Sequence, residues 1–158
     1  MSIRTQMKPH PFVAQASLRT WPAAAVLTLL LIGCEKAQLD DEARGLCAQD
    51  GGITVYESVK RQVSNVDPNA GLALPPLGKQ SAGDQFAYAW TSRTLKSGNP
   101  SLNREEIRII RLSDGKALGQ LVSYSRIGGD MPGPWHESHF SCPEGADTRT
   151  LMRAVFVD

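Results

Sequence analysis

A run of thirteen apolar residues near the start of the chain, Trp21–Gly33 (WPAAAVLTLLLIG), limits what the rest of the sequence can fold into. It follows a polar segment without acidic residues whose basic side chains are Arg4, Lys8 and Arg19. As a helix the run would measure about 20 Å, which is shorter than the ~30 Å hydrocarbon core of a bilayer. A basic segment followed by a short apolar run is instead typical of a removable export signal. The sequence therefore predicts that residues 1–33 are a signal peptide.

The apolar run ends in a small residue followed by a cysteine, in the order Leu31-Ile32-Gly33-Cys34. This order resembles the lipobox of bacterial lipoproteins. The resemblance implies that the Cys34 thiol receives a diacylglyceryl group and that a signal peptidase cuts before Cys34. The new amino group is then acylated, with palmitate as a typical chain. Such chains anchor stably, because each buried CH₂ contributes about 0.8 kcal/mol. The alternative is a buried cysteine at the end of an apolar helix.

The residue after the cysteine bears on which membrane would hold the anchor. An aspartate there would resemble the inner-membrane retention signal of enteric bacteria, so Glu35 favours the outer membrane, with the domain facing the periplasm. Translation starts at Met1 or at Met7, since both leave a basic segment before the apolar run. Two further segments, Cys47–Glu57 and Phe140–Pro143, resemble small uncharacterised envelope lipoproteins of Gram-negative bacteria, a likeness that implies no activity.

If Cys34 is lipidated, Cys47 and Cys142 remain as a pair. In an exported protein such a pair is most often a disulfide, because the periplasm is oxidising. The alternative is a reactive or metal-binding thiol, but neither cysteine has a CxxC partner. We therefore expect a bridge that joins the start of the folded domain to a segment near its end. A bridge of this kind contributes about 2–4 kcal/mol.

The composition describes one globular domain of near-neutral charge. The chain has 17 Lys and Arg against 16 Asp and Glu, a formal net charge of +1. Removal of residues 1–33 takes away three basic groups, which leaves 14 basic against 16 acidic groups and a net charge of −2. There is no bulk basic surface for nucleic acid. The remaining 125 residues are enough for one core, and we expect a lipidated tether over 34–38 and a single periplasmic domain over 39–158.

The mature chain has the pattern of one helix followed by several strands. A helix is expected up to Gly51, because one helical face would carry Leu39, Ala43, Leu46 and Cys47. Strands are expected over 53–59, from Gln85 onward, over 104–112 and over 117–127.

Asp114-Gly115 between the last two strands is a strong hairpin signal. The tail from Thr148 is expected to form a turn of helix that leads into a short strand at 154–157. The predicted fold class is α+β: an N-terminal helix packed on a mainly antiparallel sheet of about four strands, with one disulfide.

One segment concentrates side chains that could carry chemistry, Trp135-His136-Glu137-Ser138-His139. Two histidines and a carboxylate are zinc ligands in many proteins. The metalloprotease pattern, however, needs two histidines four residues apart on a helix, whereas His136 and His139 are three apart in a proline-rich segment. Loop histidines that pack on Trp135 or pair with surface acids are the favoured interpretation. The sequence therefore predicts no catalytic residue, no metal site and no cofactor.

Two groups of side chains are candidates for a binding surface. Phe86, Tyr88 and Trp90 would share one face of a strand, where together with Trp135 they could contact a partner. Core packing is the more common role of such a stripe. A basic patch is the second candidate, formed by Arg104, Arg108, Arg111 and Arg126, although the interleaved Glu105 and Glu106 favour a charge-paired surface.

The sequence as a whole favours a lipid-anchored, non-catalytic binding or structural module that contacts another envelope protein. Immunity proteins, which neutralise periplasmic toxins, are one sub-case. The alternative is a small metal-dependent periplasmic hydrolase that uses the His136–His139 loop.

Overall fold

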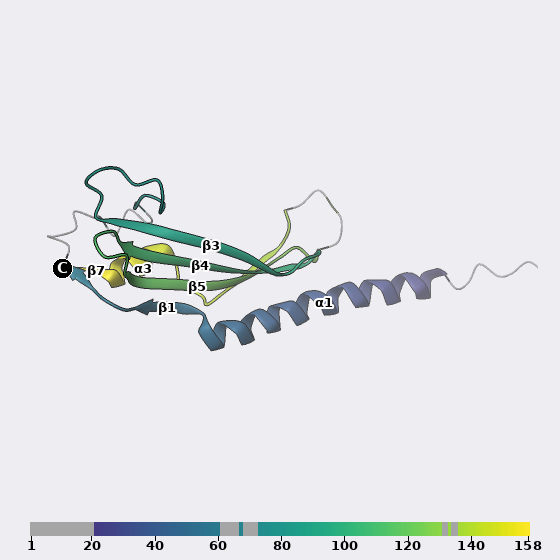
Figure 1. Cartoon of the computed structure of the whole chain (residues 1–158). Helices are drawn as coiled ribbons and strands as arrows, with labels where there is room; N and C mark the ends of the chain where they lie inside the picture. Colours follow the sequence, from purple (N-terminus) through teal and green to yellow (C-terminus); the bar gives the residue numbers. More distant parts are fainter. Residues whose placement is uncertain (1–20, 61–66, 68–72, 131–132, 134–135) are drawn as a thin grey trace, which may run out of the picture.

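The computed structural model describes residues 21–60, 67, 73–130, 133 and 136–158, and side chains from Glu35 onward within these ranges. In this part of the chain a five-stranded antiparallel sheet has a helix on each face and a two-stranded sheet at one end. Figure 1 shows the long strands running beside the N-terminal helix. The predicted α+β class, with a mainly antiparallel sheet, is confirmed.

Three strands of eleven residues form the middle of the sheet: β3 (Phe86–Lys96), β4 (Ser101–Arg111) and β5 (Ala117–Ile127). Each pairs with the next in antiparallel register. Two shorter strands, β1 (Gly52–Val55) and β6 (His139–Cys142), pair with different halves of β5. One edge of the sheet is therefore β3, and the other is shared by β1 and β6.

Helix α1 runs without a break from Trp21 to Asp50. Its residues Leu39 and Ala43, four apart as the sequence pattern requires, are buried on Leu102 and Val122 of the sheet. The sheet face that they cover is called here the α1 face. Figure 1 shows the second half of α1 beside the sheet and the first half projecting past its end.

Helix α3 (Thr148–Val155) covers the opposite face, called the α3 face, near the other end of the strands. Asp147 caps it, because its carboxylate accepts the Thr150 N–H. Gly119 of β5 lies beneath the helix, and a Cβ there would be 2.7 Å from Val155 Cγ2, so the close packing of α3 requires glycine. The chain then enters β7 (Phe156–Val157), which pairs in parallel with β2 (Val59–Lys60).

Three further predictions compare differently with the structure: the hairpin at Asp114-Gly115, the C-terminal tail and the strand over 53–59. The hairpin forms at Asp114-Gly115, where Gly115 has a φ of 72°. The expected order of helix and strand in the tail is present as α3 and β7, but the helix is longer than one turn and includes residues 154–155, which were expected in the strand. The strand expected over 53–59 is interrupted, because the N–H groups of Tyr56 and Glu57 both donate to the Leu118 carbonyl and the chain leaves the sheet.

Two other segments differ from expectation. Residues 34–38, expected as a tether, are helical, since Glu35, Lys36, Ala37 and Gln38 are helix formers and neither Gly nor Pro interrupts them. Strand β6 was not expected and makes the sheet five-stranded, because its four residues form a strand by pairing with β5. No helix in the described ranges is long and apolar enough to cross a membrane.

Candidate functional site

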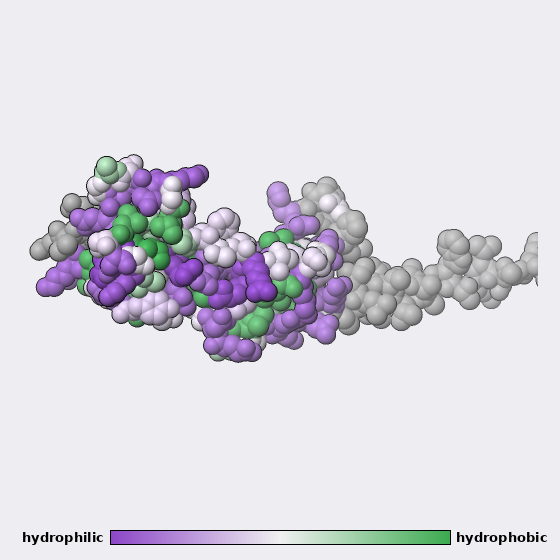
Figure 2. Space-filling view, viewed as in Figure 1, coloured by the Kyte–Doolittle hydropathy of each residue, from purple (hydrophilic) through white to green (hydrophobic). Residues whose placement is uncertain are grey.

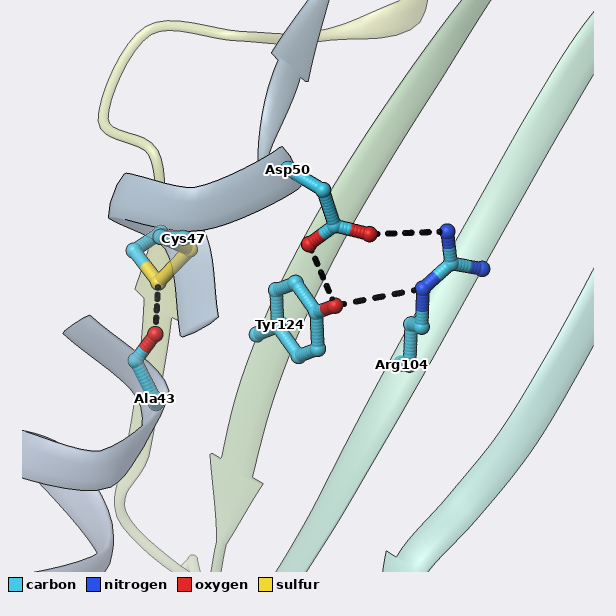
Figure 3. Close-up of a disulfide and its surroundings, with 6 residues drawn as sticks. Ala43, Cys47, Asp50, Arg104 and Tyr124 are labelled. Atoms are coloured by element: carbon cyan, nitrogen blue, oxygen red, sulfur yellow. Dashed lines mark hydrogen bonds and ion pairs between the residues drawn. A yellow bond between two sulfur atoms is a disulfide. The ribbon is translucent and has the colours of Figure 1, made fainter. Parts of the chain in front are cut away.

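The disulfide joins α1 to β6 on the α1 face. Cys47 and Cys142 are bonded across 95 residues of sequence, with their Cα atoms 6.1 Å apart. The expected bridge is therefore present. The sulfur of Cys142 also lies 3.2 Å from the Ala43 carbonyl oxygen, one turn earlier in the helix, as Figure 3 shows. The last turns of α1 are thus held on the sheet edge by a covalent bond.

Asp50, Tyr124 and Arg104 form a hydrogen-bonded triangle beside the bridge (Figure 3). The Tyr124 hydroxyl donates to Asp50 at 2.6 Å, and Arg104 donates to both partners at 3.2 Å. The bond from Tyr124 is the main reason that the pKa of Asp50 lies below its ordinary value. Burial is the main reason that the pKa of Tyr124 is raised. The ionised Asp50 therefore fastens the C-terminal end of α1 to β4 and β5.

Arg126 of β5 makes a second polar attachment to α1, ten residues earlier in the helix. Its side chain is only 3% exposed, and its Nε lies 2.8 Å from the Asp40 carboxylate. The Nη1 group donates to the carbonyl oxygens of Gly128 and Ser138 and to the Ser138 hydroxyl. The buried charge is thus balanced by one carboxylate and donates to three further groups. It joins α1 to the segments on both sides of the loop between β5 and β6.

A third attachment lies one more turn toward the start of α1. The Lys36 ammonium group is 2.6 Å from the Asp130 carboxylate, which also accepts the Ser138 N–H. The hydrogen bond from Lys36 is the largest cause that lowers the pKa of Asp130 to about 2. Gly129 is packed tightly here, since a Cβ at this residue would be 3.3 Å from the Lys36 Cβ. The helix is therefore fixed to the sheet along its whole length from Lys36 to Asp50.

The four arginines of the suggested basic patch are each paired with acids. Arg104 and Arg108 share Glu106 on the α1 face, as the predicted alternation of Glu105 and Glu106 requires. Arg126 is buried on Asp40. Arg111 lies at the far end of β4 between Glu57 and Asp114. The charge-paired interpretation therefore holds, and the basic patch is not formed.

The outer edge of β3 offers backbone groups to a partner. At its start the edge is covered, because the Tyr88 N–H donates to Pro75 and its carbonyl accepts the Leu77 N–H. Backbone direction alternates along a strand, so Trp90 and Ser92 also direct their N–H and C=O groups outward. Among the described residues, no backbone partner is found for these outward groups. The second half of β3 is therefore an open sheet edge.

Side chains of opposite character lie on the two faces of this open edge. Trp90 is 59% exposed on the α3 face, beside Ile107. On the α1 face, the exposed Arg93 lies directly opposite Arg104 of β4. No acid within the described residues forms an ion pair with Arg93. An edge segment from Trp90 to Thr94 thus combines free hydrogen-bonding groups, an aromatic ring and an unpaired cation, and it is the candidate site.

The aromatic stripe of the sequence is divided by the fold. Phe86 is buried in the core under α3 and packs edge to face on Phe156, with ring centroids 5.1 Å apart. Tyr88 is half-buried against the same core. Only Trp90 of these three is largely exposed, on the edge strand of the sheet. Core packing therefore explains the first two residues and leaves the third as a surface group. Trp135 lies outside the described residues.

The histidines stay on the surface. His136 is exposed ahead of β6, and His139 is exposed at its first residue. His139 lines a cavity of about 580 Å³ together with Glu144 and Asp147. Within the described ranges, no three His, Cys, Asp or Glu side chains lie together as metal ligands do.

A second cavity, of about 780 Å³, lies at the end of the sheet that carries α3, where Figure 2 shows hydrophobic side chains gathered on the surface. Its lining combines Phe86 and Leu112 with polar groups, among them Arg111. The Arg111 guanidinium is held by Glu57 and Asp114, and it lowers the pKa of Asp114 to about 2. Its charge is therefore already balanced within the protein.

Comparison with known proteins gave no family, no curated relative and no solved structure that matches this chain. The candidate site is therefore identified from the geometry of the structure. Sequence reasoning identified Trp90 but not the open edge beside it, because which strand lies at the edge is decided by pairing between distant segments.

Proposed function

We propose that this protein is a lipid-anchored binding module of the bacterial envelope, and that the Trp90–Thr94 edge of β3 receives an extended segment of a partner protein. The module is non-catalytic and works by holding its partner close to a membrane, with the outer membrane as the expected site. The anchor is the acylated Cys34 that the lipobox-like sequence implies.

The observation that carries the binding role is the open edge itself. A peptide that adds a strand to a sheet gains backbone hydrogen bonds over its whole length, while side chains on alternate sides provide specificity. Here the added strand would pass between Trp90 on one face and Arg93 on the other. The fitting partner is an extended segment with an apolar side chain toward Trp90 and an acidic side chain toward Arg93.

The binding role is tested by removing one outward donor. In the Ser92→Pro variant the N–H that faces outward is lost, whereas the ladder between β3 and β4 uses the neighbouring residues Thr91 and Arg93. We expect capture of the envelope partner by the full-length protein to weaken by about tenfold or more, which corresponds to about 1.4 kcal/mol.

The matched control is Ser92→Ala, which changes the same side chain but retains the N–H. It should capture the partner as the original protein does. Equal capture by the proline and alanine variants, with both folded by circular dichroism, would refute strand addition at this edge.

The anchor is tested separately. The Cys34→Ser variant should incorporate no radioactive palmitate and should leave the membrane fraction, because the thiol that receives the diacylglyceryl group is gone. The Cys47→Ser/Cys142→Ser double variant keeps Cys34 and should still be labelled. Palmitate incorporation into Cys34→Ser would refute lipidation at this residue.

A further inference from the structure

The distance between the proposed anchor and the folded domain is set by the attachments of α1. Lys36 is held by Asp130, and Asp40 is held by the buried Arg126. Both contacts join the helix to residues at one end of the sheet. That end, called here the anchor end, comprises the turn at 97–100 and the segment Ile127–Asp130.

Almost no chain lies between these attachments and Cys34. Residues 34–36 are helical, and at 1.5 Å per residue Cys34 lies only about 3 Å along the axis from Lys36. A flexible tether would let a domain move freely above a membrane. A helix that two ion pairs hold against the domain does not allow this movement. Figure 1 shows the end of the sheet where β5 ends lying close to the middle turns of α1.

The anchor end also exposes apolar side chains. Ile127, the last residue of β5, is 40% exposed, and Leu95, near the end of β3, is 36% exposed. Leu95 is left without a pairing partner where the register shifts between Thr94 and Lys96. Apolar groups next to an acyl anchor are stabilised when they enter the boundary between headgroups and acyl chains.

We propose that the anchor end of the domain lies directly on the phospholipid surface, with Leu95 and Ile127 toward the headgroups, and that the end carrying α3 is held away from the membrane. The inference rests on the proposed lipidation of Cys34. Eleven-residue strands span about 35 Å, so the cavity beside Phe86 and the C-terminus lie roughly that far above the surface. The open edge of β3 runs between the two ends.

The test compares two exposed serines at opposite ends of the sheet. Ser97 lies in the turn at the anchor end, and Ser113 lies in the hairpin between β4 and β5. Ser97→Cys and Ser113→Cys variants of the full-length, natively lipidated protein are labelled with a fluorophore. They are then placed in vesicles of phosphatidylethanolamine and phosphatidylglycerol that contain a headgroup spin label as quencher. We expect strong quenching at position 97 and none at position 113.

A third variant separates contact from anchoring. A flexible Gly-Ser insertion between Glu35 and Lys36 leaves Cys34 intact, so the Ser97→Cys protein should still float with the vesicles but should lose its quenching. Equal quenching at the two ends, or quenching unchanged by the insertion, would overturn this inference and leave the anchor standing. Failure of all the proteins to float would overturn the anchor, and this inference with it.

Discussion

A buried guanidinium group is unusual in a domain of this size, and Arg126 shows how such a charge is accommodated. The four groups that accept its hydrogen bonds are one carboxylate, two backbone carbonyls and one hydroxyl. A buried ion stabilises a fold only when its remaining donors are satisfied, and removal of one partner leaves the other group unpaired. The residue therefore acts mainly by positioning α1 and the two segments next to Gly128 and Ser138.

We expect the Arg126→Ala variant to be destabilised by about 3–5 kcal/mol, because the substitution removes the cation that pairs with Asp40 and a donor to the buried Gly128 carbonyl. Urea denaturation followed by circular dichroism measures the change. The matched control is Lys96→Ala, which breaks an exposed ion pair between the sheet and Glu42 of the same helix and should cost at most about 1 kcal/mol. Similar losses in the two variants would contradict a structural role for the buried charge.

At the scale of elements, α1 is held by a covalent bond and by polar contacts spread along its length, whereas α3 packs on the sheet through the apolar side chains Leu151, Met152 and Val155. The difference follows from where the helices lie. Helix α3 covers the apolar half of the sheet, around Ile109 and Leu121. Helix α1 crosses a face that carries Arg104 and Arg126, so its contacts combine a small core with ion pairs.

Loss of the disulfide should loosen one element more than the others. Replacement of Cys47 and Cys142 by alanine is expected to lower the free energy of unfolding by about 2–4 kcal/mol. Hydrogen exchange should accelerate in α1 and β6, which the bridge joins, and should change little in β3, which forms the opposite edge of the sheet. Uniform acceleration through all strands would show instead that the whole sheet depends on the bridge. Intact mass without reductant, two hydrogens below the reduced value, confirms that the bond forms in the purified protein.

For the whole molecule, ion pairs and capping bonds set how stability depends on pH. The pKa values of five carboxyl groups are lowered in the folded protein by hydrogen bonds to cations, hydroxyls or backbone N–H groups: Asp50, Glu57, Asp114, Asp130 and Asp147. A lowered pKa means that the folded state favours the ionised form. The stability this contributes is complete above the ordinary carboxyl pKa and is lost as the pH falls through the lowered value.

We therefore expect constant stability near neutrality and a decline that begins near pH 4 and continues to about pH 2, the pKa of Asp114 and Asp130. The raised pKa of Tyr124 has the opposite consequence, since stability is lost as the pH rises above its ordinary value of 10.0. Urea denaturation across pH measures both limits. The Asp130→Asn variant should show a shallower acid decline than the original protein. An unchanged slope would contradict the role of the Lys36–Asp130 pair.

The sequence by itself determined the local features of this protein. The spacing of Leu39 and Ala43 defines the buried side of α1, Asp114-Gly115 defines the hairpin, and alternation places Glu105 and Glu106 on opposite faces. Pairing of Cys47 with Cys142 followed from the count of cysteines once Cys34 was set aside. The buried helix side, the hairpin and the alternation depend on residues close together in the sequence, and the disulfide depended on which cysteine remained to pair. A pattern in the sequence is therefore sufficient to predict them.

Only the tertiary structure decided which of these elements meet. It made β3 an edge strand, left Trp90 uncovered while burying Phe86, and formed β6 from residues with little strand character of their own. It also joined Lys36 to Asp130, 94 residues away in sequence, and so turned an expected tether into a fixed helix. Contacts between distant segments depend on the packing of the whole chain, and no short pattern in the sequence encodes them. For this reason both the candidate binding edge and the anchor end became visible only in the fold.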